Sequence, residues 1–510
     1  MRRVPRTAAP RASQASTTAV PMVVPMVART AVPMVARTAV PTAARTAVPM
    51  VARTAVPMVA RTAVPTAGRT VAQVADLTPS SSTADELTAQ GGPVDRPALR
   101  RCTHLEPAQF ATAVWGEHAS LSRREVLPSG FADLLDADAV DVLLSRRGLR
   151  TPFLRVAKAG RTLPDARFTR SGGVGATMAD QVDDAALARL FADGSTIVLQ
   201  GLHRTHEPIM AFVQALAADL GHPVQANAYV TPPQNQGFSA HYDVHDVFVL
   251  QIGGEKRWVI HEPVLRHPRR DQPWNDRRAA VEARAATEPL LDVVLRPGDA
   301  LYLPAGFLHA AQALGETSIH LTLGVHTWTR AHLLAALVAR LDGIEALRTP
   351  LPLGVDVADA DAVDAELAAV VEALAVAAPG VAAADVAAAL ARQSTTASRA
   401  EPVAPLAQAR ALAAVDLWSR LRWRAHLPAT VIDAEGSGAA TPDGLPGLVV
   451  RTAEATVTLP AGAAAGVRRL LAGEVLSVAE LGAGDDGPME DVDRLEVART
   501  LLRTALAVPE

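Results

Sequence analysis

The sequence contains a single cysteine, only two lysines and no long uncharged apolar run. The lone Cys102 excludes an intrachain disulfide framework and a cysteine-ligated zinc site, and it indicates a reducing, cytoplasmic compartment. No apolar stretch reaches the roughly 18 residues that a membrane span needs, so we expect no membrane association. Because nearly all of the 49 basic residues are arginines, Lys158 and Lys256 are candidates for positions that arginine cannot fill.

Charge is unevenly distributed along the 510 residues. Residues 1–75 contain ten arginines and neither aspartate nor glutamate, so this segment carries +10. The whole chain carries −4, which leaves −14 on the remaining residues. A mildly acidic body argues against direct nucleic-acid binding by bulk electrostatics.

An octad repeat fills the N-terminal segment. Arg-Thr pairs recur every eight residues with a proline between successive pairs, at Arg29, Arg37, Arg45, Arg53, Arg61 and Arg69. Regular prolines prevent both a long helix and a central strand. We therefore predict that residues 1–95 are a disordered, low-complexity octad repeat and linker that carries no function.

The rest of the chain divides into three predicted segments. Residues 96–330 begin with helical patterns and continue, from residue 225, as short β-rich runs separated by Pro and Gly, which indicates a sandwich or barrel behind a helical lead-in. Residues 331–404 are helical and rich in Ala and Val. Residues 405–510 combine a predicted helix over 406–421, which includes the start of the basic run 420–424, with a strand pair and two further helices.

Two histidines and one aspartate in the β-rich block suit a metal. His241 and Asp243 are two residues apart, so on an extended strand both side chains point the same way. His309 follows a Pro-Gly-Asp turn and an apolar strand predicted at 300–303. Two His and one carboxylate on a β scaffold form the facial triad that holds Fe(II) and leaves positions open for a co-substrate and O2. A His-x-Asp spacing alone is a weak signal in a chain with 14 His and 53 acidic residues.

Lys256 strengthens the metal hypothesis. It lies thirteen residues after Asp243, beyond a predicted strand and a Gly253-Gly254 turn. We expect a hairpin to return Lys256 beside the metal, where its cation would bind the distal carboxylate of a dicarboxylate. A solvated hairpin lysine is the alternative, but the scarcity of lysine, the β context and His309 favour a role in the site.

The motifs around these residues resemble the JmjC-type ribosomal oxygenases. They are Asn227-Ala228-Tyr229-Val230-Thr231-Pro232-Pro233, His241-Tyr242-Asp243, Val247-Phe248-Val249-Leu250-Gln251, Gly254-Glu255-Lys256-Arg257-Trp258 and Gly306-Phe307-Leu308-His309. The resemblance covers about residues 100–510. It implies an α+β fold in which a double-stranded β-helix, the jelly-roll or cupin JmjC barrel, follows N-terminal helices. A helical dimerisation segment (331–404) and a winged-helix-like domain (405–510) would come after it.

The resemblance also implies an activity. His241, Asp243 and His309 would ligate Fe(II), and Lys256 would pair with the C5 carboxylate of 2-oxoglutarate. The protein would be a 2-oxoglutarate-dependent dioxygenase that uses O2 to hydroxylate a protein side chain, in a ribosomal protein by analogy with the family. It would act as a homodimer.

Other pocket residues follow from the same resemblance. Asn227 and Tyr229 match family positions that line the pocket. Ser318, His320 and Thr322 lie on the strand after His309, where the family has polar pocket residues. Phe238 stands where some relatives place a hydroxyl that touches 2-oxoglutarate. The hydroxyl partner of that carboxylate is therefore unassigned.

Two other functions fit the same residues. One is a JmjC-type hydroxylase of a small molecule or a peptide natural product. The other is a non-catalytic cupin that serves as a binding module, which the intact triad with Lys256 disfavours. Turnover of 2-oxoglutarate with iron separates the second alternative from the enzymes, because a binding module would have none.

We predict that a protein without residues 1–75 retains iron binding and 2-oxoglutarate turnover. The proline-punctuated repeat has no core-forming pattern, so its removal should leave the catalytic domain intact. Iron titration and succinate release measure the two activities. A truncated protein that is soluble and folded but inactive would contradict the prediction.

Overall fold

The computed structural model describes residues 95–510 except 176, 236–237, 342, 398, 434–437, 442–443, 445–446 and 483–488. The octad repeat and nearly all of the predicted linker lie outside the described residues. The described residues belong to one compact unit, Glu86–Glu510. The helices that open it are α2 (Pro97–Cys102), α3 (Pro107–Ala113), α4 (Ala137–Arg146), α5 (Asp184–Ala192), α6 (Leu202–Thr205) and α7 (Glu207–Leu220).

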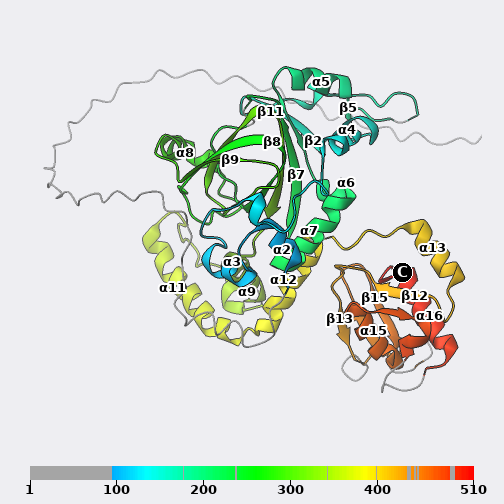
Figure 1. Ribbon diagram of the computed structural model, residues 1–510. Coiled ribbons are helices and arrows are strands. Elements are labelled where there is room, and N and C mark those ends of the chain that lie inside the picture. Colours follow the sequence, from blue (N-terminus) through cyan, green and yellow to red (C-terminus); the bar gives the residue numbers. More distant parts are fainter. Residues whose placement is uncertain are drawn as a thin grey trace, which may run out of the picture. The chain divides into compact units, whose positions relative to one another are not determined.

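A curled antiparallel sheet, mostly green in Figure 1, forms the centre of the first half of the described chain. Nine strands make this sheet, in the order β1-β10-β8-β11-β7-β6-β2-β3, with β9 paired to β8. They are β1 (Ser120–Ser122), β2 (Leu154–Lys158), β3 (Arg161–Thr162), β6 (Thr196–Leu199), β7 (Val224–Thr231), β8 (Asp246–His261), β9 (Leu291–Leu295), β10 (Ala300–Leu303) and β11 (Leu308–Val325). A short separate pair, β4 (Thr169–Arg170) and β5 (Gln181–Val182), and helix α8 (Arg278–Ala285) lie between them in sequence.

Strand β8 is continuous through Gly253 and Gly254, so the predicted hairpin is wrong. The strand pairs with β11 on both sides of the glycines, with β10 before them and with β9 after them. Gly254 has a φ of +62°, and the register with β11 shifts after Leu314. A left-handed glycine beside a bulge bends a strand instead of reversing it. Lys256 therefore lies on the same strand, just beyond the bend.

The two faces of the barrel wall differ in chemistry. On β7, buried and half-buried residues alternate, as expected when side chains point to opposite sides in turn. Ala228 and Val230 belong to the largest hydrophobic cluster, which also contains Ile209 and Leu216 of α7. Tyr229 points to the other side, and this inner face carries the candidate site.

Helices follow the barrel, as predicted. They are α9 (Arg330–Leu341), α10 (Glu345–Arg348), α11 (Ala360–Ala377) and α12 (Ala383–Ala397). Large apolar side chains on α9 and α11 are exposed: Leu333, Leu334, Val338, Leu367, Val370, Val371 and Val376. Among the described residues no single helix is long and apolar enough to cross a bilayer, although the bent pair Ala360–Gly380 and Ala383–Thr395 reaches that length and hydropathy together.

The C-terminal segment has a hydrophobic core of its own. Its elements are α13 (Pro405–Ala414), β12 (Arg420–Trp423), β13 (Thr430–Ile432), β14 (Gly447–Arg451), β15 (Thr456–Pro460), α15 (Ala464–Leu471), β16 (Val475–Ser477), α16 (Asp491–Arg503) and β17 (Ala507–Pro509). The predicted pair of strands is present as β14 and β15. The predicted helix over 406–421 is too long, because the Asp416 carboxylate accepts hydrogen bonds from the amides of Trp418 and Ser419 in a turn that ends it.

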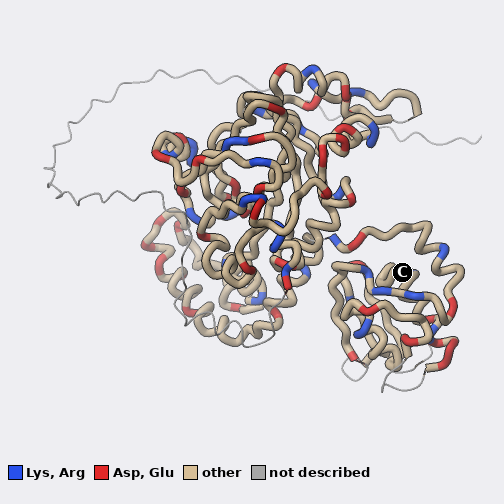
Figure 2. The backbone as a smooth tube through the Cα atoms, viewed as in Figure 1, with Lys and Arg blue, Asp and Glu red and all other residues tan. Residues whose placement is uncertain are grey.

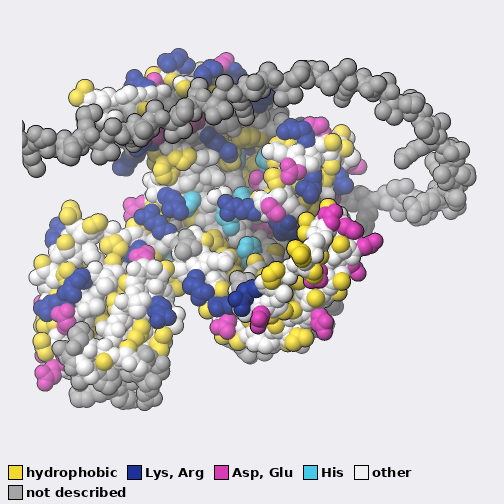
Figure 3. All heavy atoms as spheres, turned by 180° about the vertical axis from the view of Figure 1, so that it is seen from behind, with side chains coloured by type: hydrophobic (Ala, Val, Ile, Leu, Met, Phe, Trp, Pro, Cys, Tyr) yellow, Lys and Arg dark blue, Asp and Glu magenta, His cyan; other side chains and the backbone are white. Residues whose placement is uncertain are grey.

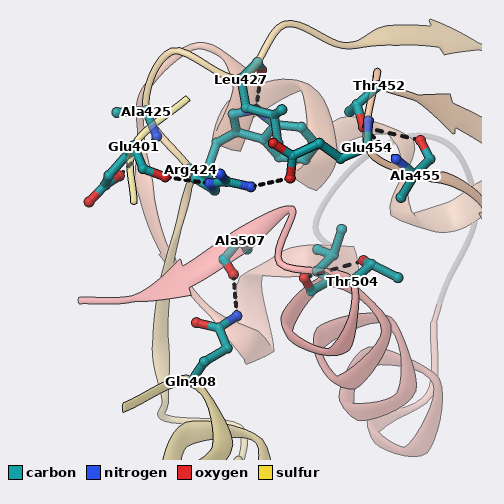
Figure 4. A network of polar contacts seen from close by, with 12 residues as sticks. Glu401, Gln408, Arg424, Ala425, Leu427, Thr452, Glu454, Ala455, Thr504 and Ala507 are labelled. Carbon is teal, nitrogen blue, oxygen red and sulfur yellow. Dashed lines mark hydrogen bonds and ion pairs between the residues drawn. The ribbon is translucent and has the colours of Figure 1, made fainter. Parts of the chain in front are cut away.

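The basic run 420–424 forms strand β12 and the residue after it, and it is not helical. Arg424 donates to the Glu401 carbonyl at 2.6 Å and pairs with the Glu454 carboxylate at 2.5 Å (Figure 4). Arg422 pairs with the Glu401 carboxylate at 2.6 Å. Acidic residues also lie near basic ones elsewhere in this segment (Figure 2). The run is therefore largely balanced by carboxylates.

We expect Gly254→Ala to lower the free energy of unfolding by about 2–4 kcal/mol. A Cβ at this position would meet the Thr317 carbonyl oxygen at 2.2 Å, in a left-handed conformation that already disfavours alanine. Gly315→Ala is the matched control, because Gly315 also has a φ of +62° but nothing within 4 Å of its Cβ. It should cost about 1 kcal/mol. Urea unfolding measures both, and equal losses would contradict the clash at the bend.

Candidate metal centre

The three predicted ligands come from two chain segments that run side by side. The His309 amide donates to the His241 carbonyl at 2.8 Å, and the reverse hydrogen bond is 3.2 Å long. The Gly306 amide donates to the Asp243 carbonyl at 2.9 Å. The segment before β8 is thus paired with the start of β11, which brings the side chains of His241, Asp243 and His309 together.

The donor atoms of these side chains converge. They all lie within 4.8 Å of one another, and His309 Nε2 is 3.7 Å from Asp243 Oδ2. The Nδ1 atom of His241 is 2.8 Å from the Ser239 carbonyl oxygen, and that of His309 is 3.2 Å from the Phe307 carbonyl oxygen. An Nδ1–H that donates to a carbonyl leaves Nε2 unprotonated and able to bind a metal.

The charge states also suit metal binding at neutral pH. Burial, followed by the neighbouring His241, lowers the pKa of His309 to about 4. Burial alone would raise the pKa of the Asp243 carboxyl, but His309, His245 and His241 together hold it below its usual value. Since His309 is neutral and Asp243 is ionised, neither has to lose a proton before it binds a cation.

The triad fits a divalent first-row metal. Two imidazole nitrogens and one carboxylate oxygen are the donor set that holds Fe(II) in non-haem oxygenases, with the remaining positions open. Across the described parts of the chain, this is the one cluster of His, Cys, Asp and Glu side chains that could hold a metal ion. The predicted metal ligands are therefore placed together.

Lys256 is buried without a counter-charge. The residue is only 3% exposed, and its ammonium group forms no ion pair with any described carboxylate. Its Nζ atom donates to Thr231 Oγ1 at 3.2 Å and lies 3.4 Å from His320 Nδ1. Burial lowers the pKa of Lys256 to about 7. Because an unpaired buried ammonium is costly, a bound anion would stabilise this residue.

A cavity of about 60 Å³ joins Lys256 to the triad. The predicted pocket residues Tyr229 and Thr322 line it, and the Tyr229 and His320 rings stack at 4.9 Å between centroids, 5° from parallel. The full lining is Tyr229, Phe238, His241, Asp243, Val247, Val249, Lys256, Trp258, His309, Ala310, Ala311, His320 and Thr322. One cavity thus contacts both the metal ligands and the buried cation.

Asn227, the third predicted pocket residue, is not among the lining residues. It faces Thr322 across the β7–β11 pairing, and its Oδ1 accepts a hydrogen bond from the Gly201 amide at 3.1 Å. This bond ties β7 to the turn after β6. Contact between Asn227 and a bound molecule stays a prediction.

Thr231 and Trp258 are among the residues of the site that were not predicted. Thr231 places its hydroxyl beside Lys256, so it is a candidate for the hydroxyl that the sequence left unassigned. Trp258 lines the cavity with its ring centroid 6.0 Å from that of His309. Both could have been found from the period of two on a strand, because Thr231 follows Tyr229, and Trp258 follows Lys256, at that spacing.

The remaining histidines do not join the triad. His245 contacts His326, with ring centroids 5.1 Å apart, and its Nε2 lies 3.5 Å from Gln225 Nε2. Seen from behind, several His side chains gather in the central region of the molecule, with Lys and Arg beside them (Figure 3). His245 is therefore a neighbour of the metal ligands and not one of them.

Residues 204–333 match the family model of the JmjC domain. This match includes His241, Asp243, Lys256 and His309, and it confirms the resemblance predicted from the motifs. The part of the barrel that carries the triad and Lys256 therefore matches a JmjC domain.

Known proteins with similar sequences include one named a ribosomal oxygenase and one named a demethylase and histidyl-hydroxylase. The chain is 35% identical over 193 residues to Ribosomal oxygenase 1 of Gallus gallus, which covers 36% of this chain and 32% of that protein. It is 40% identical over 104 residues to the "Bifunctional lysine-specific demethylase and histidyl-hydroxylase NO66" of Drosophila persimilis, which covers 20% of this chain and 14% of that protein. The chain thus spans a third or less of the length of these two relatives.

Solved structures with a similar fold include a bacterial enzyme. The ribosomal oxygenase YcfD of Escherichia coli, in complex with cobalt and 2-oxoglutarate, matches with a TM-score of 0.44 and 17% identity. The match covers 80% of this chain and 98% of that chain.

We expect Asp243→Ala to weaken divalent-metal binding by more than the 10- to 100-fold typical of a lost outer-shell partner, because it removes the one anionic donor. Calorimetric titration of metal-free protein with Mn(II) measures the affinity directly. His245→Ala is the matched control, two residues further along the chain, and should leave the affinity nearly unchanged. Equal losses in both variants would show that Asp243 is not a ligand.

Proposed function

We propose that this protein is an Fe(II)- and 2-oxoglutarate-dependent dioxygenase that hydroxylates a side chain of a ribosomal protein. The observation that carries the proposal is the buried, unpaired Lys256 ammonium in the same cavity as the His241, Asp243 and His309 triad. A metal-binding triad alone suits many reactions. A triad joined to a buried cation suits a dianionic co-substrate that is held at both ends.

Different residues of the cavity would bind the iron and the co-substrate. His241, Asp243 and His309 would hold the iron, which with 2-oxoglutarate and O2 supplies the oxidation of a C–H bond. Lys256 and the Thr231 hydroxyl would bind the C5 carboxylate of 2-oxoglutarate. The enclosed position of Lys256 excludes water from this ion pair, which strengthens it. Tyr229 and His320, stacked on each other, form the wall beside it.

A ribosomal protein as substrate is supported by the names of the curated relatives, which are ribosomal oxygenases and a histidyl-hydroxylase. The test uses ribosomal proteins from cells that lack this gene, incubated with the purified protein, Fe(II), 2-oxoglutarate and O2. Intact-mass spectrometry should detect one species heavier by one oxygen atom. If 2-oxoglutarate is consumed but no ribosomal protein changes mass, the substrate is a small molecule or a peptide natural product.

The proposal also covers the roles of the two C-terminal segments and the cellular compartment of the protein. Helices α9 to α12 would form a dimerisation segment, and residues 405–510 would form a winged-helix-like domain that has a structural role. The protein would act in the cytoplasm, where a buried free thiol such as that of Cys102 stays reduced.

We expect Lys256→Ala to raise the KM for 2-oxoglutarate by about 10- to 150-fold while Fe(II) affinity stays nearly unchanged. A charge-assisted hydrogen bond contributes roughly 1.5–3 kcal/mol, which corresponds to that range. Succinate release at varied 2-oxoglutarate gives the KM, and metal titration gives the second value. An unchanged KM would show that Lys256 does not bind the co-substrate.

The pH dependence provides an independent test of Lys256. With a pKa of about 7, the free lysine is charged below pH 7 and neutral above it. Because only the ammonium attracts a carboxylate, the KM for 2-oxoglutarate should rise as pH increases from 7 to 8.5, by at most about tenfold per unit. Lys256→Arg should remove this dependence, since arginine stays protonated, although its different length should weaken binding at every pH. A parallel rise in both proteins would contradict the assignment.

We expect a homodimer at micromolar concentration. The exposed apolar residues on α9 and α11 form unpartnered helix faces, and burying them in a second copy would stabilise both chains. Light scattering measures the mass. Val371→Glu, at a position that is 58% exposed, should shift the protein to monomer without loss of helix content by circular dichroism. A stable monomer in the unaltered protein would contradict the prediction.

A further inference from the structure

Arg155 lies on the inner face of the barrel, two strands from Tyr229. In the register of the sheet, Arg155 on β2 faces Val198 on β6, and Val198 faces Tyr229 on β7. Cross-strand partners point to the same side of a sheet. The flanking residues Leu154 and Val156 point the other way, into the outer hydrophobic cluster. The arginine side chain therefore shares the side of the sheet that carries the metal centre.

Among the described residues, the Arg155 guanidinium interacts with the Tyr229 hydroxyl and with the charge of Asp243, but it forms no close ion pair. Its central carbon lies 5.4 Å from the centroid of the Phe238 ring, a cation–π contact. Its Nε atom is buried and has no hydrogen-bond partner. It also adds to the histidines that hold the pKa of Asp243 low against the opposing effect of burial, so its charge acts on the metal ligands from nearby.

Tyr229 and His320 stand between Arg155 and Lys256. Tyr229 faces His320 in the β7–β11 register, and His320 Nδ1 is the atom close to the lysine. Lys256 thus serves one end of the cavity, whereas Arg155 lies against the Phe238 wall and is not itself a lining residue. Neither cation has a close ion-pair partner among the described residues, and the two are positioned for different ligands.

We propose that Arg155 determines substrate specificity by binding an oxygen acceptor of the polypeptide, a main-chain carbonyl or a carboxylate, beside the side chain that is hydroxylated. This inference rests on the proposed function. The planar guanidinium presents several N–H donors in fixed directions, and a partly buried cation of this kind gains most from an acceptor that also excludes water. The contact with Phe238 keeps the fork in place before the substrate arrives.

The test compares Arg155→Met with the unaltered protein, using ribosomal proteins as the substrate probe. Methionine keeps an apolar stem against Phe238 but removes the donors. We expect the KM for the ribosomal protein to rise about 10- to 150-fold, and the KM for 2-oxoglutarate to change far less. Arg155→Lys, which keeps the charge without the fork, should give an intermediate KM. Arg161→Met is the matched control, because Arg161 is an exposed arginine on the adjacent strand β3.

The outcomes separate this inference from the proposed function. Product formation with equal kcat/KM in both proteins would overturn the role of Arg155 and leave the proposed function intact. An equal rise in the KM for 2-oxoglutarate would also overturn it, because that result places Arg155 at the co-substrate. No product from the unaltered protein would overturn both. If Arg155→Met does not fold, the KM for the ribosomal protein is compared between Arg155→Lys and the unaltered protein instead.

The acceptor group that binds Arg155 can be identified by changing residues of the ribosomal protein that is hydroxylated. Each Asp or Glu near the hydroxylated residue is replaced by its amide, and the KM is measured again with the unaltered enzyme and with the Arg155→Met variant. If one replacement removes the difference between the two enzymes, the acceptor is that carboxylate. If the difference persists with every replacement, the acceptor is a main-chain carbonyl. Each result supports the inference and names the acceptor.

Discussion

The pairing of β8 with β11 is the constraint on which the candidate site depends. The two strands run antiparallel on both sides of the bend at Gly254, so β8 belongs first to the wall shared with β10 and then to the wall shared with β9. His309 lies near the start of β11 and Lys256 lies just past the bend of β8. A change in the register of this pair would move both residues to the opposite face, because side chains alternate with a period of two.

The inner face of this barrel carries more positive charge than it can balance. Lys256 and Arg155 both lack a carboxylate partner among the described residues, while the one nearby acid, Asp243, belongs to the metal ligands. Desolvated charges of one sign are unfavourable unless a ligand completes them. An anionic group that binds at either cation would therefore contribute favourably to the binding free energy. The two cations lie at separate positions beside the metal centre. The C-terminal segment differs, since Arg422 and Arg424 there are paired with Glu401 and Glu454.

Some parts of the site could be read from local sequence and others could not. The ligands were predicted because a His-x-Asp spacing and a histidine after a Pro-Gly-Asp turn are short-range patterns. The Gly253-Gly254 pair was read as a hairpin, because two glycines between β-rich runs suit a tight turn as well as a bend. Only the pairing with β11, which lies more than fifty residues away, selects the bend. Arg155 had no local signal at all, since its relation to Tyr229 runs through two strand pairings.

The sequence by itself determined the residue types and their local order: the alternation on β7, the helix that ends at Gly221, the triad spacing and the motifs of the JmjC domain. These depend on neighbours within a few residues, where backbone geometry fixes direction. The tertiary structure decided which side chains meet. It brought Thr231 to Lys256, engaged Asn227 with the Gly201 amide, and ended the helix before 420 so that its arginines joined a sheet. These contacts join strands far apart in the chain, and their energies come from burial and pairing that no local pattern contains.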